Sequence, residues 1–141
     1  MSEMGCDGLE VLVLDDEPIV IKSLKMALGK IGCNVEVFQE PEDALSRLDQ
    51  KEFDIVVTDV VMGDIDGIQV LEYVMERSSH TKVIIMTAFA MMEMARKAME
   101  RGAFDFIAKP FDAEEIRAVV VKAAEARRAE MQNGDEPKHR P

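Results

Sequence analysis

The sequence predicts an α/β protein with a doubly wound sheet of five parallel strands and helices on both of its faces. Strand-like and helical segments alternate strictly along the chain, five of each, which is the pattern of repeated right-handed βαβ units. Three of the strand segments are almost continuously apolar, as expected for strands that are buried on both faces. In such sheets ligands bind outside the carboxyl ends of the strands, so we look for a site there.

The first half of the chain contains three expected strands and two expected helices. The strands lie at 9–14, 35–38 and 53–58, and the helices at 17–32 and 41–50. The first and third strands are apolar runs, and the second alternates strictly, as a half-buried strand does. The first helix has apolar residues at helical spacing until Gly32, which is expected to end it. Pro41 stands in the first turn of the second helix, where proline is favoured.

The second half completes the pattern with three helices and two strands. The helices lie at 67–78, at 90–102 and from Asp112 to about Met131, and the strands at 82–88 and 105–108. The third helix has apolar residues on one face, and Gly102 is expected to end the fourth. The last helix opens on Asp-Ala-Glu-Glu, a capping box whose acids suit the N-terminal end of the helix dipole.

Length and composition indicate one domain of ordinary size. The chain has 141 residues, and 48% of them are hydrophobic, enough for a real core. We expect a lead at 1–8, one folded domain at 9–126, and the end of the last helix with a mobile tail at 127–141. The N-terminus lacks the features of a signal peptide and no apolar run reaches 18 residues, so we expect a cytoplasmic protein without a membrane span.

The charge balance argues against two classes of partner. The formal net charge is −11 at pH 7. Nucleic-acid-binding proteins usually present a basic surface, so we expect direct binding neither to nucleic acid nor to an anionic membrane.

The cysteines and histidines give little sign of function. Cys6 and Cys33 are far apart in the sequence and lack metal-ligand spacing, so we expect both to be reduced and one of them to be buried. His80 is expected in a loop and His139 in the tail, and neither has a neighbour that suggests catalysis.

Polar residues stand where the central strands end. The first strand ends on Asp15 and Asp16, the third on Asp59, the fourth at Thr87 and the fifth on Lys109. Because the carboxyl ends of parallel strands meet at one edge of a sheet, we expect these five side chains to form one site.

The residue types at this edge suit phosphoryl transfer. Three carboxylates repel one another, and a hard cation such as Mg²⁺, which prefers oxygen ligands, removes that repulsion. Asp59 is a carboxylate nucleophile of the kind that forms an aspartyl-phosphate, Lys109 is a point charge for a phosphoryl oxygen, and Thr87 offers a hydroxyl donor. The alternative is purely structural: Asp16 could cap the helix that follows it, and Lys109 could belong to an ordinary Lys-Pro turn.

Four stretches of the chain resemble the receiver domain of bacterial two-component response regulators. They are VLVLDDEP, DIVVTDVVMGDIDG, VIIMTA and GAFDFIAKPF, and they span nearly the whole chain from Leu9 to about Ala126. The resemblance implies a flavodoxin-like fold with strand order 2-1-3-4-5. It also implies a signalling switch that a histidine kinase phosphorylates, and that catalyses only its own phosphorylation and dephosphorylation rather than acting as an enzyme on other molecules.

The resemblance assigns the acidic residues to phosphate and metal. Asp59 is the implied phosphoacceptor. Mg²⁺ or Mn²⁺ is held directly by Asp16 and Asp59, directly or through water by Asp15, and by the backbone carbonyl of Val61.

The other implied roles concern the phosphoryl group and the switch. Thr87 and Lys109 contact the phosphoryl group in this family, and the bond between Lys109 and Pro110 is typically cis. Phe106 is the implied switch aromatic, which turns inward when Thr87 moves towards the phosphoryl group.

Three residues near the acceptor are of special interest. Gly63 stands where the family commonly has proline, so we expect a more mobile loop there. Val61 and Phe89 lie two residues after Asp59 and Thr87, where side chains flank the path of a water that attacks the aspartyl-phosphate. Both are apolar, so we expect slow self-dephosphorylation, with Phe89 shielding the site. The alternative is that neither side chain faces the phosphoryl group.

The resemblance places the output face on the fourth helix, the fifth strand and the fifth helix. The fourth helix carries four methionines, which adapt well to varied partners. They are Met91, Met92, Met94 and Met99. We expect part of this set to meet an effector domain, an effector protein or a second copy of the chain through the fourth and fifth helices. The alternative is that these methionines pack in the core and that some of them are left exposed.

Three other functions stay open at this point. A phosphorelay carrier would pass its phosphoryl group to a histidine phosphotransfer protein. A Mg²⁺-dependent phosphatase with an aspartyl nucleophile usually carries Asp-x-Asp on its first strand, whereas Asp15 and Asp16 are adjacent. A flavin-binding protein of this fold is disfavoured because the first turn is acidic and would repel the flavin phosphate.

Overall fold

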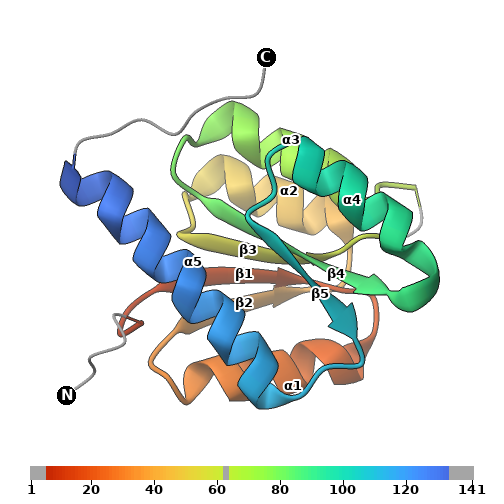
Figure 1. The fold of residues 1–141 in the computed structure, drawn as a ribbon, viewed down its shortest axis with the longest axis horizontal. Coiled ribbons are helices and arrows are strands. Elements are labelled where there is room, and N and C mark those ends of the chain that lie inside the picture. The colour runs from red at the N-terminus through yellow and green to blue at the C-terminus, as the bar shows by residue number, and fades with distance from the viewer. Residues whose placement is uncertain (1–5, 62–63, 134–141) are drawn as a thin grey trace.

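The computed structural model describes residues 6–61 and 64–133, in which five parallel strands form one sheet. The strands are β1 (Glu10–Leu14), β2 (Asn34–Phe38), β3 (Ile55–Asp59), β4 (Lys82–Ala88) and β5 (Asp105–Lys109). Every pairing is parallel, and the order across the sheet is β2-β1-β3-β4-β5 (Figure 1). The predicted fold class and strand order are confirmed.

Helices cover both faces of this sheet. The described residues form α1 (Pro18–Gly29), α2 (Pro41–Gln50), α3 (Gly67–Arg77), α4 (Met92–Glu100) and α5 (Ala113–Asn133), with a short 3₁₀ helix, η1 (Phe89–Met91), before α4. α1 and α5 lie on one face and α2, α3 and α4 on the other (Figure 1). Val11 and Val13 point into the apolar cluster under α1 and α5, and Leu12 and Leu14 into the cluster under α2 to α4, because successive side chains of a strand point to opposite faces.

Two helix ends differ from the prediction. α1 ends at Gly29, before Gly32, because the N–H groups of Ile31 and Gly32 bond to carbonyls only three residues back, which tightens the chain into turns. The helix expected from residue 90 begins instead with η1, and α4 starts at Met92. The capping box of α5 is confirmed: Glu115 N donates to Asp112 Oδ1 at 2.8 Å, and Asp112 N donates to Glu115 Oε1 at 2.9 Å.

The end of α5 is attached to the sheet rather than solvated. Arg127 pairs with Asp54 at 3.0 Å, just before β3. Glu130 pairs with Lys82 at the start of β4 and with His80 at 3.2 Å in the preceding loop. The helix is therefore held to the sheet as far as Glu130.

Cys6 and Cys33 are both buried and share a hydrogen bond, so the expectation that one of them is buried is wrong. A turn brings them together: Leu9 N donates to Cys6 O at 3.1 Å, and Gly8 N donates to Gly32 O at 2.9 Å. Burial raises the pKa of both thiols, that of Cys33 to about 12, so both are neutral at pH 7.

Some predictions lie outside the described residues. These are the mobility of the loop at Gly63 and the tail that carries His139. Within the described part of the chain, none of the helices is both long enough and apolar enough to cross a membrane.

Candidate functional site

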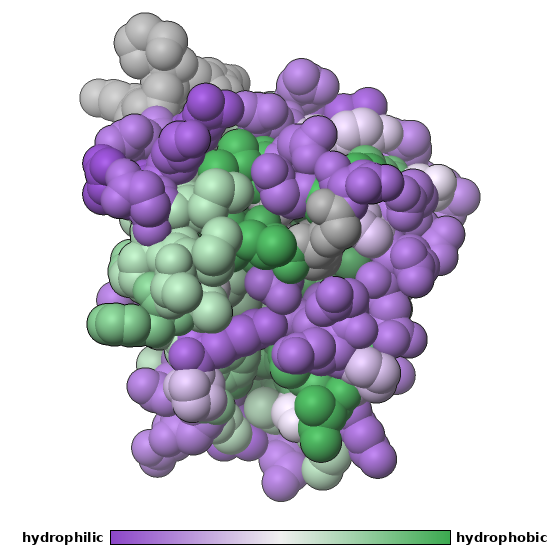
Figure 2. All heavy atoms as spheres, turned by 90° about the vertical axis from the view of Figure 1, so that its right-hand side faces the viewer, coloured by the Kyte–Doolittle hydropathy of each residue, from purple (hydrophilic) through white to green (hydrophobic). Residues whose placement is uncertain are grey.

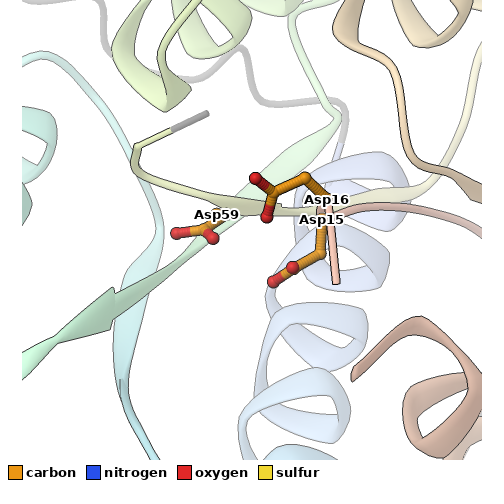
Figure 3. Close-up of side chains that lie close together, drawn as sticks. All are labelled: Asp15, Asp16 and Asp59. Atoms are coloured by element: carbon orange, nitrogen blue, oxygen red, sulfur yellow. The ribbon is translucent and has the colours of Figure 1, made fainter. Parts of the chain in front are cut away.

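Three carboxylates meet where the strand order reverses, between β1 and β3. Leu14 pairs with Thr58, so the residues that come next, Asp15 and Asp59, reach the edge of the sheet side by side. One carboxylate oxygen from each of Asp15, Asp16 and Asp59 lies within 4.8 Å of the other two (Figure 3). The crevice at such a reversal is where open α/β sheets bind ligands.

Lys109 joins the carboxylates from the edge strand β5. Its Nζ lies 2.7 Å from Asp15 Oδ2, 3.1 Å from Asp59 Oδ2 and 3.6 Å from Glu17 Oε1. The bond from Lys109 to Pro110 is cis, as the resemblance implied. One ammonium group thus bridges the two inner carboxylates.

Burial and charge oppose each other at this bridge. Asp15 is fully buried, and this burial, with the charge of Asp59, raises the pKa of its carboxyl group. The hydrogen bonds that Asp15 accepts from Lys109 and from the backbone N–H of Glu17, the latter at 2.8 Å, lower that pKa but do not cancel the rise. Burial lowers the pKa of Lys109, but its bonds to Asp15 and Asp59 outweigh burial and raise it. Lys109 therefore stays protonated and supplies the countercharge that the acids need.

The start of α3 holds the backbone of Asp59 in place. A Cβ on Gly67 would lie 2.5 Å from the carbonyl oxygen of Asp59 and 2.8 Å from Cα of Val60, so only glycine allows this approach. Asp66 caps α3: its Oδ1 accepts from Gln69 N at 2.9 Å, and Gln69 Oε1 accepts from Asp66 N at 2.9 Å. Sequence analysis missed this capping box, although the Asp-x-x-Gln spacing is its usual signature.

Thr87 and Phe106 lie near the site without joining the acids. Thr87 is buried, and its hydroxyl lies 3.1 Å from the carbonyl oxygens of Ala88 and Met91, towards η1. Phe106 is half-buried and packs against the apolar cluster under α2 to α4. Their predicted roles in a switch stay predictions.

Val61 and Phe89 are both exposed on this side of the molecule. The side chains are 44% and 84% exposed, and Val61 N donates to Asp59 Oδ1 at 3.4 Å. Figure 2 shows this side, where green apolar areas interrupt a largely hydrophilic surface. At 84% exposure Phe89 packs against very little in this conformation, so shielding of Asp59 would require η1 to move.

The structural roles considered for Asp16 and Lys109 differ from the contacts observed. The N-cap residue of α1 is Glu17, without a side-chain cap, so Asp16 does not cap that helix. Lys109 belongs to more than a turn, since its ammonium bonds to two carboxylates.

The donor set suits a small divalent cation. Asp15 is buried, Asp59 half-buried and Asp16 exposed, so the oxygens open from the protein interior towards solvent. Mg²⁺ takes oxygen ligands and usually keeps several waters, which a half-open set of three carboxylates allows. Asp15, Asp16 and Asp59 are the residues that would hold it.

The parallel sheet, the acids at its edge and the cis Lys-Pro bond agree with what the receiver resemblance implies. The family model for the response regulator receiver domain matches residues 11–121. The chain therefore belongs to the response regulator receiver domain family.

Individual proteins of this family match the chain over most of its length but differ in how much of their own length is matched. Response regulator protein PilR of Pseudomonas aeruginosa is 30% identical over 123 residues, which cover 87% of this chain and 28% of that protein. Full-length FixJ from B. japonicum superposes with a TM-score of 0.80 at 30% identity, over 86% of this chain and 60% of that one. A response regulator receiver domain from Clostridium thermocellum superposes with a TM-score of 0.81 at 26% identity, over 86% and 98%. The chain thus spans less than a third of PilR and nearly all of an isolated receiver.

Proposed function

We propose that this receiver accepts a phosphoryl group from a histidine kinase onto Asp59 and thereby changes its output face. The observation that carries the proposal is the position of Lys109, whose ammonium lies 2.7 Å from Asp15 and 3.1 Å from Asp59. A lysine held between two acids in a crevice is ready to receive a phosphoryl oxygen, because the phosphate would bring its own negative charge to the same place.

The transfer is a displacement at phosphorus. A carboxylate oxygen of Asp59 forms a P–O bond, the P–N bond of the donor phosphohistidine breaks, and its electron pair returns to the imidazole nitrogen. Asp59 is better placed to attack than Asp15, since the side chain of Asp59 is 13% exposed whereas that of Asp15 is fully buried. Asp15, Asp16, Asp59 and the carbonyl of Val61 would hold Mg²⁺ or Mn²⁺, which would supply positive charge to offset that of the phosphoryl oxygens.

A hollow beside the acids gives a donor room to approach. It has a volume of about 440 Å³ and lies between the first turns of α1 and the loop after β5. Ile19, Val20 and Phe111 give it apolar walls, and Lys109 belongs to its lining. A donor seated there would lie next to the lysine that contacts Asp59.

The switch would start at Thr87. Its hydroxyl now lies 3.1 Å from Met91 O, at the end of η1. A phosphoryl oxygen on Asp59 competes for that hydroxyl, and when Thr87 turns towards it, η1 and α4 lose a contact and Phe106 has room to turn inward. Phosphorylation would shift the population between two states of the face formed by α4, β5 and α5.

The four methionines of η1 and α4 divide between core and surface. Met91 and Met94 pack against the apolar cluster, Met92 is half-buried, and Met99 is 36% exposed. Core packing thus accounts for two of the four. We propose that the remainder belongs to a contact with an effector domain, an effector protein or a second copy.

The test is intact mass measured over time after incubation with acetyl phosphate and Mg²⁺. We expect one added phosphoryl group, no addition to an Asp59→Asn variant, and no addition without the cation. We also expect no multiple turnover of phosphate esters, because the chain acts only on its own acyl phosphate. A stable adduct on the Asp59→Asn variant, or turnover of added esters, would contradict the proposal.

A further inference from the structure

Cys6 and Cys33 lie at the amino ends of two neighbouring strands, at the edge of the sheet opposite the acids. Cys33 comes directly before β2 and Cys6 comes shortly before β1, and these strands pair in parallel from Glu10 and Asn34 onward. The acids lie at the carboxyl ends of the same sheet. The two thiols are therefore separated from Asp59 by the length of the strands.

A turn over residues 6–9 folds Cys6 back onto the segment that contains Cys33. Leu9 N donates to Cys6 O at 3.1 Å, and Gly8, the third residue of the turn, has a φ of +75°. A type II turn requires a positive φ at that position, which glycine adopts without steric cost. The local sequence thus specifies the chain reversal that brings the two cysteines together.

Backbone contacts hold the neighbours of the two cysteines against each other. Gly8 N donates to Gly32 O at 2.9 Å. A Cβ on Gly32 would lie 3.0 Å from Cα of Asp7, and Gly32 also has a positive φ, of +94°. The residue after Cys6 therefore rests directly on the residue before Cys33, and a glycine is needed at that point of contact.

The two thiols point towards each other inside the apolar core. Cys6 is fully buried, Cys33 is 8% exposed, and a hydrogen bond joins their side chains. Both belong to the apolar cluster under α1 and α5, together with Ala123 and Ala124 of α5. A disulfide requires neighbouring cysteines whose side chains point towards each other, and this pair meets that requirement.

The surroundings of the pair do not offer a zinc site. Structural zinc usually takes four ligands. Among the residues that the structure describes, the set of three or more side chains placed to share a cation is Asp15, Asp16 and Asp59, which includes neither cysteine. Two thiols in contact without further ligands suit reversible oxidation instead.

We propose that Cys6 and Cys33 form a reversible disulfide within the chain when a small disulfide such as oxidised glutathione is in excess. The thiolate of Cys33, the more exposed of the two, attacks one sulfur of the oxidant and releases one glutathione thiolate. The thiolate of Cys6 then attacks the sulfur of Cys33 and releases the second glutathione. Two thiols of the chain are thus oxidised, and one glutathione disulfide is reduced to two glutathione thiols.

Burial slows this exchange without opposing its equilibrium. The pKa of both thiols is raised by burial, and the thiolate is the form that reacts. Access to Cys6 requires the turn to open, which breaks the backbone hydrogen bonds donated by Gly8 and Leu9. The pair therefore responds to sustained rather than brief oxidation.

The disulfide would tie the N-terminal turn to the start of β2. The closed loop contains β1 and α1, and a cross-link over such a loop stabilises the folded state, mainly by restricting the unfolded chain. The thiol state would thus set the stability of the side of the domain on which α1 and α5 pack. This effect needs no phosphoryl group and goes beyond the proposed function.

The test equilibrates the 141-residue chain with mixtures of reduced and oxidised glutathione, in native buffer and in concentrated urea. After acid quenching, intact mass gives the oxidised fraction. The chain has two cysteines, so a monomer that has lost two hydrogen atoms carries the bond between them. We expect the equilibrium constant for disulfide formation to be about a hundredfold larger in native buffer than in urea, because the fold already holds the thiols in contact.

The stability of the oxidised chain gives a second, independent measurement. Its midpoint in urea should lie about 1 M above that of the reduced chain. The matched control is Cys33→Ala, which can form no internal disulfide and whose midpoint the same treatment should not raise. Circular dichroism checks that this variant folds.

Three results would overturn the proposal. They are an equilibrium constant no larger in native buffer than in urea, oxidation of the unaltered chain to dimers or glutathione adducts in place of the internal bond, and an oxidised chain no more stable than the reduced one. Each of them would mean that Cys6 and Cys33 only fill space in the core.

Discussion

The position of Asp59 depends on Gly67, which has no reactive side chain. The amide of Gly67 donates to Val60 O at 2.8 Å, and the missing side chain lets α3 start directly against the carbonyl of Asp59. Gly67 does not have a positive φ, so the requirement is for space rather than for an unusual backbone conformation. The reactive residue is thus placed by contact between two backbones.

We expect Gly67→Ala to destabilise the protein by about 1–3 kcal/mol, because the new methyl group meets backbone atoms that cannot rotate away. Urea denaturation measures the change, and the rate of phosphorylation by acetyl phosphate should fall as well. Gly29→Ala is the control: its methyl group meets nothing, and alanine favours the helix, so we expect stability unchanged or increased by about 0.5 kcal/mol. If both variants changed the stability equally, the contact at Gly67 would not be the cause of the destabilisation.

The side chain of Phe89 is expected to shield the aspartyl-phosphate at Asp59 from attacking water. Its ring is exposed while Thr87 bonds to the carbonyl at the end of η1, and release of that bond would free Phe89 to approach Asp59. We expect Phe89→Glu to shorten the lifetime of the aspartyl-phosphate by about tenfold, because a carboxylate can orient an attacking water. Decay of the phosphorylated mass measures the lifetime. An unchanged lifetime would mean that residue 89 stays away from the phosphoryl group.

Among the elements, α5 is held at both ends by polar contacts. Its capping box fixes the start, and Arg127 and Glu130 fix the far end to the beginnings of β3 and β4. Burial raises the pKa of Glu130, but the bonds to Lys82 and His80 outweigh burial and lower it, so Glu130 is ionised at neutral pH. The stretch of α5 from Arg127 to Glu130 is therefore held to the sheet, although three of its four residues are charged.

We expect Glu130→Gln to weaken this attachment by about 1 kcal/mol, because glutamine keeps the shape of the side chain and loses its charge. Hydrogen exchange measured by mass spectrometry should show faster exchange in the last turns of α5. Glu125→Gln, at an exposed position of the same helix, should leave exchange unaltered. Faster exchange in both variants would point to helix propensity instead of the ion pairs.

Charge also joins separate elements of the whole molecule, through a neutral network of two acids and two bases. Arg47 donates to both oxygens of Glu36, at 2.8 and 3.1 Å, and Lys51 bridges Glu36 and Glu10 at 3.2 and 2.7 Å. The bonds from Arg47, with those from Lys51, lower the pKa of Glu36 to about 2. This network ties α2 to β1 and β2.

The depressed pKa of Glu36 predicts a pH dependence with a definite sign. A carboxyl group with a lower pKa in the folded state stabilises that state above its unfolded pKa, and the stabilisation disappears as pH falls from about 4.5 to about 2. We expect Glu36→Gln to lower the free energy of unfolding by about 1 kcal/mol at pH 7 and by almost nothing near pH 2. Urea denaturation of both proteins across this range measures the difference. A difference that stays constant to pH 2 would exclude ionisation of Glu36 as its source.

The sequence by itself determined the alternation of elements, the parallel sheet and the acids at its edge. These follow from local periodicity and from the rule that parallel strands end at a common edge, so Asp15, Asp16, Asp59 and Lys109 could be grouped without coordinates. The capping boxes are equally local, and the one at Asp66 could have been found from its spacing.

Only the tertiary structure decided how side chains from distant segments meet. The contact between Cys6 and Cys33, the turn of the Thr87 hydroxyl towards η1, and the pairing of Glu130 with β4 each join segments whose relative position no local pattern encodes. Periodicity reports which face of an element is buried, and packing decides what that face touches.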